Sequence, residues 1–132
     1  MKFSDELPIY IQIMNYLKRQ ITAGEISRGD KLASVRELSS KLKVNPNTVQ
    51  RAYQELEREN LVFTKRGMGT FVTENSEIIT NLKKDTAKKV INNFIVEMKG
   101  LGFDNNEIIE IILGEIKKEA SYGESSRNKE NI

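Results

Sequence analysis

Apolar residues recur at the spacing of one helix face in three segments of the N-terminal half of the chain. The first segment predicts a helix from Pro8 to about Gly24, the second a short helix over 34–42, and the third a helix from Asn45 to near Asn60. The residues expected to point inward are Tyr10, Ile13, Met14, Leu17 and Ile21 in the first, Val35, Leu38, Ser39 and Leu42 in the second, and Val49, Ala52, Tyr53 and Leu56 in the third.

Start and stop signals support these helices. Ser34 and Glu37 have the spacing of a capping box, in which each side chain satisfies a free backbone N–H at the helix start. Asn45 is a suitable N-cap, and Pro46 suits the first helical position. Asn60 tolerates the left-handed conformation that ends many helices.

After Asn60 the pattern changes from helical to alternating. A strand is predicted over 61–66 with Leu61 and Phe63 on one side, and a second strand over 70–73, joined by a turn over 67–69. Three helices followed by a two-stranded hairpin is the element order of a winged helix-turn-helix. Residues 1–75 are therefore predicted to form such a domain.

The C-terminal part changes character again. One long helix is predicted over 77–99, and its apolar stripe switches faces near Asp85 and Thr86, so either the helix breaks there or its halves pack against different things. Gly-rich residues 100–102 end it, and a second helix capped by Asp104 runs to about Ala120. Residues 121–132 are small, polar and charged, which favours a disordered tail.

The fold class expected is therefore mostly α, with an antiparallel two-helix hairpin over 76–120 behind the winged domain. A lone hairpin has little to bury its apolar side chains against, and such exposed surface is typical of interfaces. We expect a two-fold homodimer in which two hairpins form a four-helix arrangement. The predicted interface residues are Ile91, Phe94, Ile95, Met98, Ile108, Ile109, Ile111, Ile112, Leu113 and Ile116.

Charge is distributed unevenly along the chain. The net charge is +2, but Arg28 to Thr73 holds nine Lys or Arg and five Asp or Glu, so this block carries 9 − 5 = +4 and the remainder 2 − 4 = −2. A basic block in the winged domain favours contact with phosphates.

Histidine and cysteine are both absent. Their absence excludes thiol catalysis, disulfides, Cys/His zinc sites and histidine acid–base chemistry. With no nucleophile–base pair, metal cluster or phosphate loop in the sequence, we expect no enzyme, no metal and no cofactor. The N-terminus lacks the pattern of a signal peptide, and Glu110 interrupts the most apolar stretch, so a cytoplasmic protein without membrane spans is expected.

The outward face of the third predicted helix carries amide and guanidinium groups. Asn and Gln can pair with adenine and Arg with guanine in the major groove, which the second helix of such a pair enters. Basic residues beside the glycines of the predicted wing can approach the DNA backbone or a narrow minor groove. The candidate DNA-binding residues are Arg36, Asn45, Pro46, Asn47, Thr48, Gln50, Arg51, Gln54, Lys65, Arg66, Gly67, Met68, Gly69 and Thr70.

Several motifs together resemble the winged domain of the GntR family of transcription regulators. They lie at residues 8–10 with Ile13, 29–32, 34–38, 45–49, 51–53, 56–57 and 66–72. The resemblance covers about residues 7 to 74, and the short C-terminal part is similar to the YtrA-like branch. It implies DNA contacts at Arg36, at Asn47, Thr48, Gln50 and Arg51, and at 66–70. Ala33 departs from a usual proline and Asn60 from a usual glycine.

These patterns predict a sequence-specific transcription regulator, a repressor that binds a palindromic double-stranded operator as a homodimer. Its half-sites would lie roughly 34 Å or a multiple apart along the duplex. The alternative is a protein-interaction module that uses the winged fold without DNA. For an unidentified small-molecule effector, two binding sites are considered: one between the hairpins of the dimer and one near residues 75–80.

Overall fold

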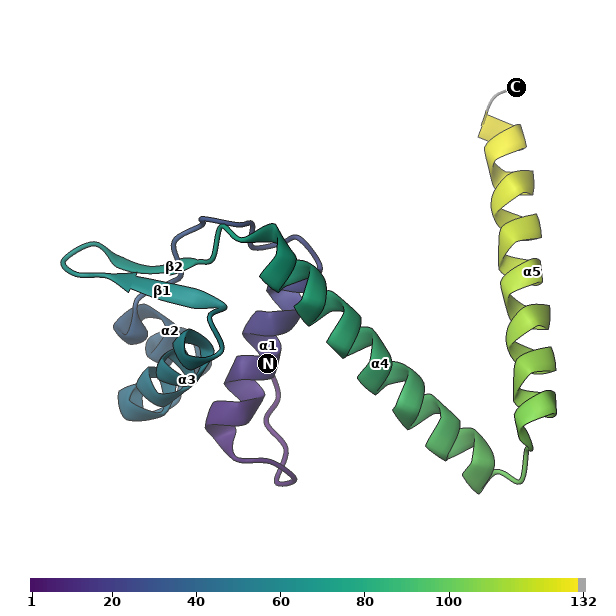
Figure 1. Cartoon of the computed structure of the whole chain (residues 1–132), viewed down its shortest axis with the longest axis horizontal. Helices are drawn as coiled ribbons and strands as arrows, with labels where there is room; N and C mark the ends of the chain where they lie inside the picture. The colour runs from purple at the N-terminus through teal and green to yellow at the C-terminus, as the bar shows by residue number, and fades with distance from the viewer. Residues whose placement is uncertain (131–132) are drawn as a thin grey trace. The chain divides into compact units, whose positions relative to one another are not determined.

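The computed structural model describes the backbone of residues 1–130 and the side chains of residues 1–121. Its elements, labelled in Figure 1, confirm a mostly helical fold with a small two-stranded sheet. The chain divides into two compact units, Met1–Thr86 and Ala87–Ile132. The elements are α1 (Ile9–Thr22), α2 (Val35–Leu42), α3 (Pro46–Arg58), β1 (Val62–Lys65), β2 (Gly69–Val72), α4 (Ser76–Gly100) and α5 (Asn105–Glu130).

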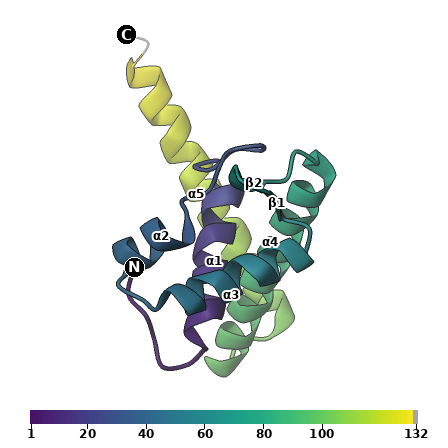
Figure 2. The ribbon, with the colours of Figure 1, turned by 90° about the vertical axis from the view of Figure 1, so that its left-hand side faces the viewer.

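The core of the N-terminal unit forms around α3. This helix packs against α1, α2 and β1, and Figure 2 shows it crossing α1. Its predicted apolar stripe is buried along its whole length, with Val49 and Leu56 fully inaccessible. Burying each such side chain contributes about 1.5–3 kcal/mol. The opposite face of α3 is therefore held outward.

Local capping sets where α2 and α3 begin. The Ser34 hydroxyl accepts from the Glu37 amide at 3.0 Å, which is one of the two bonds of the predicted capping box. The Asn45 side-chain oxygen accepts from the Asn47 amide at 2.8 Å, as predicted. Asn60 adopts a left-handed conformation with φ 62°, also as expected. Lys43, which follows α2, adopts the same conformation with φ 57° although nothing in the sequence pattern indicates it.

The wing is a hairpin with an added edge. β1 and β2 pair antiparallel from Val62↔Val72 to Lys65↔Gly69. The segment before α2 pairs with β2, since the Leu32 amide donates to the Thr70 carbonyl and the Val72 amide to the Asp30 carbonyl, both at 2.8 Å.

One prediction about β1 is wrong. Leu61 and Phe63 were expected on one side, but Leu61 and Val62 are the buried residues. Leu61 precedes the strand, directly after the left-handed Asn60, so the two-residue alternation starts at Val62. Phe63 consequently points outward and stacks on Phe71, with ring centroids 5.8 Å apart.

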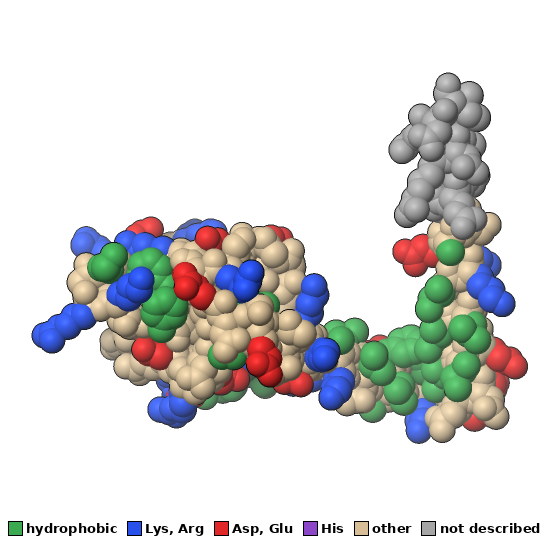
Figure 3. Space-filling view, turned by 45° about the horizontal axis from the view of Figure 1, so that its top comes forward, with side chains coloured by type: hydrophobic (Ala, Val, Ile, Leu, Met, Phe, Trp, Pro, Cys, Tyr) green, Lys and Arg blue, Asp and Glu red, His purple; other side chains and the backbone are tan. Residues whose placement is uncertain are grey.

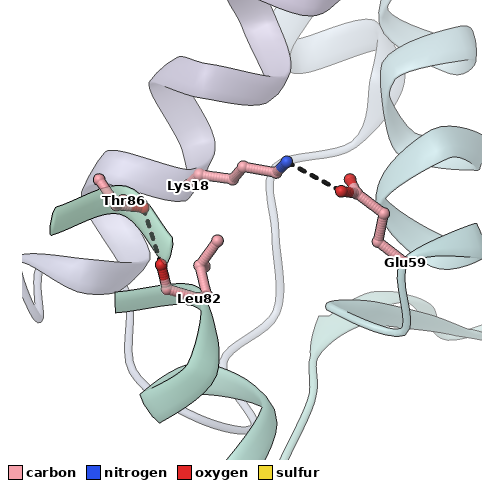
Figure 4. A network of polar contacts seen from close by, with 4 residues as sticks. All are labelled: Lys18, Glu59, Leu82 and Thr86. Atoms are coloured by element: carbon pink, nitrogen blue, oxygen red, sulfur yellow. Dashed lines mark hydrogen bonds and ion pairs between the residues drawn. The ribbon is translucent and has the colours of Figure 1, made fainter. Parts of the chain in front are cut away.

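Helix α4 is continuous across the predicted switch near Asp85 and Thr86. Its first part packs on the N-terminal core through Ile78, Ile79 and Leu82, and the boundary between the units follows Thr86. The Thr86 hydroxyl donates to the Leu82 carbonyl at 2.8 Å (Figure 4). The two halves of α4 therefore belong to different units, which is the second of the two alternatives left open by the sequence.

The C-terminal unit contains the second half of α4, a turn and α5. Asp104 and Glu107 form a reciprocal capping box, with distances of 3.1 and 2.9 Å. After the turn the two helices diverge and do not pack along their lengths (Figure 1). Of the predicted interface residues on α5, Ile108 is buried, but Ile109, Leu113 and Ile116 are exposed. Two helices of one chain offer each other too little surface to bury all of them.

Helix α5 extends to Glu130, beyond the predicted end near Ala120, into the segment expected to form a tail. Extending an existing helix by one residue costs far less free energy than nucleating a new helix, so a polar segment can continue α5. The last two residues of that predicted tail lie outside the described residues. Within the described part of the chain, no helix is both long and apolar enough to cross a membrane.

Candidate nucleic-acid interface

The outward face of α3 presents the predicted polar side chains to solvent. Asn47, Gln50, Arg51 and Gln54 are all exposed, while the apolar stripe on the other side of the helix is buried. The burial of that stripe fixes the rotation of the helix about its own axis. These amide and guanidinium groups therefore form one accessible strip.

Arg51 has a partner on another helix. Its guanidinium carbon lies 3.9 Å from the centre of the Tyr10 ring, which comes from the first turn of α1. The ring was predicted to point into the core, but Tyr10 is only half-buried and its face is used by Arg51. A cation over an aromatic face is attracted by the ring quadrupole.

The acidic residues of α3 are held by partners within the protein. The Glu55 carboxylate lies 3.1 Å from the Arg58 guanidinium. The Glu57 carboxylate accepts from the amide and hydroxyl of Thr64 at 3.3 and 3.4 Å, which ties the helix to the wing. These carboxylates occupy the C-terminal half of α3, away from the strip at its start.

A further ion pair joins the end of α3 to α1. The Lys18 ammonium lies 3.0 Å from the carboxylate of Glu59 at the C-cap of α3 (Figure 4). The Lys18 side chain is 17% exposed, so this pair is better shielded from solvent than the pair of Glu55 and Arg58. It fixes the far end of α3 relative to α1.

The start of α3 is organised by its cap. The Asn45 oxygen is occupied by the Asn47 amide, and Pro46 has no N–H to donate. Asn45 and Pro46 therefore shape the start of α3, and the side-chain NH2 of Asn45 remains a donor. Thr48 is half-buried at this start, and Arg36 is exposed in the first turn of α2.

The tip of the wing depends on two glycines. Gly67 and Gly69 have φ of +78° and +123°, values that side-chain-bearing residues rarely adopt. Met68 between them is 60% exposed. A Cβ added at Gly69 would lie 2.7 Å from the Lys31 Cε, so the lysine stem lies directly against this glycine.

The outward face of the wing carries one cation near two aromatic rings. The Lys65 ammonium lies 5.6 Å from the centre of the Phe63 ring and 5.1 Å from that of Phe71. Lys31 is not among the predicted DNA-binding residues. It forms an isolated antiparallel β-bridge with Phe71 at the added edge of the wing. The signal that could have found it is its position directly before the buried Leu32, where an extended segment must expose it.

Tyr53 connects α3 to the segment that starts α2. Its ring is 5% exposed, and its hydroxyl donates to the Ala33 carbonyl. Burial, with a smaller contribution from the Glu37 carboxylate, raises the pKa of Tyr53 to about 12. Tyr53 thus holds the two helices of the helix-turn-helix together as a neutral donor.

The structure leaves every predicted DNA-binding residue exposed or half-buried, within the N-terminal unit. The wing turn and helices α2 and α3 lie at the same end of that unit, at the left of Figure 1. Among the ion pairs of the described residues, none involves Arg36, Arg51, Lys65 or Arg66. Their charges are therefore available to an anionic partner.

Comparison with known proteins agrees with this geometry. A model of the GntR family of bacterial regulatory proteins matches residues 9–72. The chain is 43% identical over 109 residues to the uncharacterized HTH-type transcriptional regulator YhcF of Bacillus subtilis, an alignment that covers 83% of this chain and 90% of that protein. It is 39% identical over 106 residues to the HTH-type transcriptional repressor YtrA of the same organism, covering 80% and 82%.

A solved GntR family transcriptional regulator from Listeria monocytogenes has a similar structure. It superposes with a TM-score of 0.77 at 46% identity, over 85% of this chain and 98% of that one. The similarity therefore extends beyond the winged unit into the C-terminal helices. These relatives are transcriptional regulators rather than enzymes, and the exposed, partly cationic face of α3 fits that class: the chain belongs to the GntR family and is a DNA-binding transcriptional regulator.

Proposed function

We propose that this regulator is a repressor that binds a palindromic operator as a homodimer. The observation that carries the proposal is the exposed amide and guanidinium strip of α3, on a helix whose other side is buried. A helix held in this way can lie in the major groove with its polar side along the base edges. The name of the repressor YtrA, which is 39% identical to this chain, supports repression as the outcome.

The proposed contacts divide between reading and anchoring. Gln50 and Arg51 face the bases, because their amide and guanidinium groups can form bidentate pairs with adenine and guanine. Lys65 and the wing turn contact phosphates and the minor groove. Arg36, at the start of α2, contacts the backbone near the same half-site.

Dimerisation is proposed through the C-terminal unit. Figure 3 shows hydrophobic side chains gathered along the second half of α4 and the first half of α5. Among the predicted interface residues, Ile91, Ile109 and Ile116 are each more than half exposed. A second copy that covers this surface would form the four-helix arrangement and set the spacing of the two winged domains.

Selection of bound sequences from random duplex DNA tests the proposal. The expected product is an inverted repeat. Arg51→Ala should relax base preference within each half-site, while Lys65→Ala should weaken all sequences alike and reduce the salt slope by about one. Recovery of sequences without an inverted repeat, or equal effects of the two variants on base preference, would contradict it.

The N-terminal unit has a groove beside the segment expected to hold an effector. It is lined by residues of the α3 end and the α4 start, and its volume is about 260 Å³. Pockets for small molecules typically span roughly 300–1,000 Å³, so the groove suits only a small effector. Its lining residues are Glu59, Leu61, Ile78, Asn81, Leu82 and Asp85.

A further inference from the structure

The contact between Tyr10 and Arg51 extends the DNA-reading surface to a helix outside the helix-turn-helix pair. We propose that Tyr10 is a positioning residue: its ring holds the Arg51 guanidinium in the orientation in which it meets a base. This inference rests on the proposed function, in which Arg51 faces the bases. It assigns to α1 a share in operator selection.

The geometry of the contact leaves Arg51 able to bind DNA. The guanidinium carbon lies over the Tyr10 ring, 3.9 Å from its centre, a distance that suits contact through the planar face of the guanidinium. Its N–H donors lie in the guanidinium plane and point outward from the edges, so stacking does not consume them. The Arg51 side chain remains exposed, and those donors are accessible.

Tyr10 is itself firmly placed. It packs against the edge of the hydrophobic core, next to the fully buried Ile13 on α1. The chain before α1 is tied down by Gln12, whose side-chain amide donates to the Ser4 and Leu7 carbonyls at 2.8 and 2.7 Å. An anchored ring can restrict a long side chain, whereas a mobile one could not.

Without this contact Arg51 would lose its orientation. The arginine side chain has several rotatable bonds, and no described ion pair holds it. Binding to a base would then have to restrict those bonds. Exposed cation–π contacts correspond to a change of about twofold to fivefold in an equilibrium constant, and desolvated ones to about 30-fold.

The test compares four proteins: wild type, Tyr10→Leu, Tyr10→Phe and Arg51→Ala. Tyr10→Leu removes the aromatic face but keeps apolar volume, whereas Tyr10→Phe keeps the face and removes only the hydroxyl. Base preference at each operator position is measured by competition between single-base variants. We expect Tyr10→Leu to reduce discrimination by about threefold to tenfold at the positions that Arg51→Ala relaxes, and nowhere else. Tyr10→Phe should match wild type.

A double variant sharpens the comparison. Tyr10→Leu should add little to Arg51→Ala, because the ring acts through the arginine. Thermal unfolding of each protein identifies any general loss of folding, which would lower affinity for all sequences and leave the position-specific preference unchanged. Full wild-type discrimination in Tyr10→Leu, or loss of discrimination in Tyr10→Phe, would overturn the inference.

A second measurement does not depend on DNA. In the free protein, protons of the Arg51 side chain should show an upfield NMR shift from the Tyr10 ring, kept in Tyr10→Phe and lost in Tyr10→Leu. If Arg51→Ala leaves base preference unchanged, the reading role of Arg51 in the proposed function fails. If it changes base preference but Tyr10→Leu does not, only the positioning role fails.

Discussion

Tyr53 shows how a single residue links the two helices that must act together. Its hydroxyl reaches the Ala33 carbonyl directly before the N-cap of α2, from the buried side of α3. A proline at position 33, the usual residue in the family that the chain resembles, would keep this carbonyl. In this chain position 33 is alanine, and the hydrogen bond from Tyr53 restrains the backbone directly before α2.

Replacing Tyr53 by phenylalanine should lower the free energy of unfolding by about 1 kcal/mol, because the part-buried hydrogen bond to the Ala33 carbonyl is lost. Urea unfolding at neutral pH measures this change. Tyr16→Phe is the matched control, since the Tyr16 hydroxyl only accepts from the neighbouring Gln20 at 3.2 Å. A shift within about 0.5 kcal/mol is expected for the control. Equal effects in both variants would refute the assigned role.

The same residue gives a pH dependence with a definite sign. The pKa of Tyr53 is about 12 in the folded protein against 10.0 for the free side chain. The unfolded chain therefore releases its proton first, and the stabilisation present below pH 10 is lost as the pH rises toward 12. Wild type should lose on the order of 2 kcal/mol more than Tyr53→Phe over this range. Parallel unfolding curves of the two proteins at pH 9 and 11.5 check it.

At the scale of elements, the wing depends on its turn. Gly69→Ala places a Cβ at a strained φ of +123° and displaces the Lys31 stem. Strain of this kind costs on the order of 1–3 kcal/mol. We expect faster hydrogen exchange at the Met68 amide, which donates to the Lys65 carbonyl across the turn, and weaker binding to all DNA sequences.

A glycine inside a helix provides the opposite case. Gly114 lies within α5, and nothing lies within 4 Å of a Cβ added there. Gly114→Ala should therefore stabilise that helix by about 0.5–1 kcal/mol, seen as a higher helical signal in circular dichroism. The prediction for the wing fails if hydrogen exchange at the Met68 amide is as slow in Gly69→Ala as in wild type, since the turn would then not need Gly69.

For the whole molecule, the prediction concerns assembly. Ile91 and Val96 both lie on α4 and are 55% and 70% exposed, but only Ile91 belongs to the predicted dimer face. Ile91→Glu should give a monomer by sedimentation, because a charge buried between two copies lacks a partner. Val96→Glu should remain a dimer, because Val96 lies on the other side of the helix.

Loss of the dimer should also weaken DNA binding. Two linked winged domains bind a palindrome with an affinity well above that of one, so Ile91→Glu should lose roughly 100-fold or more on the full operator. Its affinity for an isolated half-site should equal that of wild type. A monomeric wild type, or a dimeric Ile91→Glu, would place the interface elsewhere.

Local patterns were sufficient for much of this fold. The stripe Val49, Ala52, Tyr53 and Leu56 specified the buried side of α3, and Asn45 with Pro46 specified its start. Both are set by neighbours along the chain, which a sequence contains in full. The start of the alternation in β1 was not obtained in this way, because it begins at Val62 and not at Leu61, which directly follows the left-handed Asn60.

Part of the candidate interface could also be predicted from local patterns. The exposure of Gln50 and Arg51 follows from helical periodicity, since each lies opposite an apolar position. The partners of those side chains do not follow from it: Tyr10 and Lys31 come from distant segments and approach only when α1 and the added edge pack.

The order of the elements, the family and the polar face of α3 follow from the sequence alone, because capping, periodicity and motif spacing act over a few residues. Packing of the folded chain places Arg51 over Tyr10, sets Lys31 against the wing and divides α4 between two units. These contacts join residues far apart in the chain, and their geometry depends on how whole helices pack.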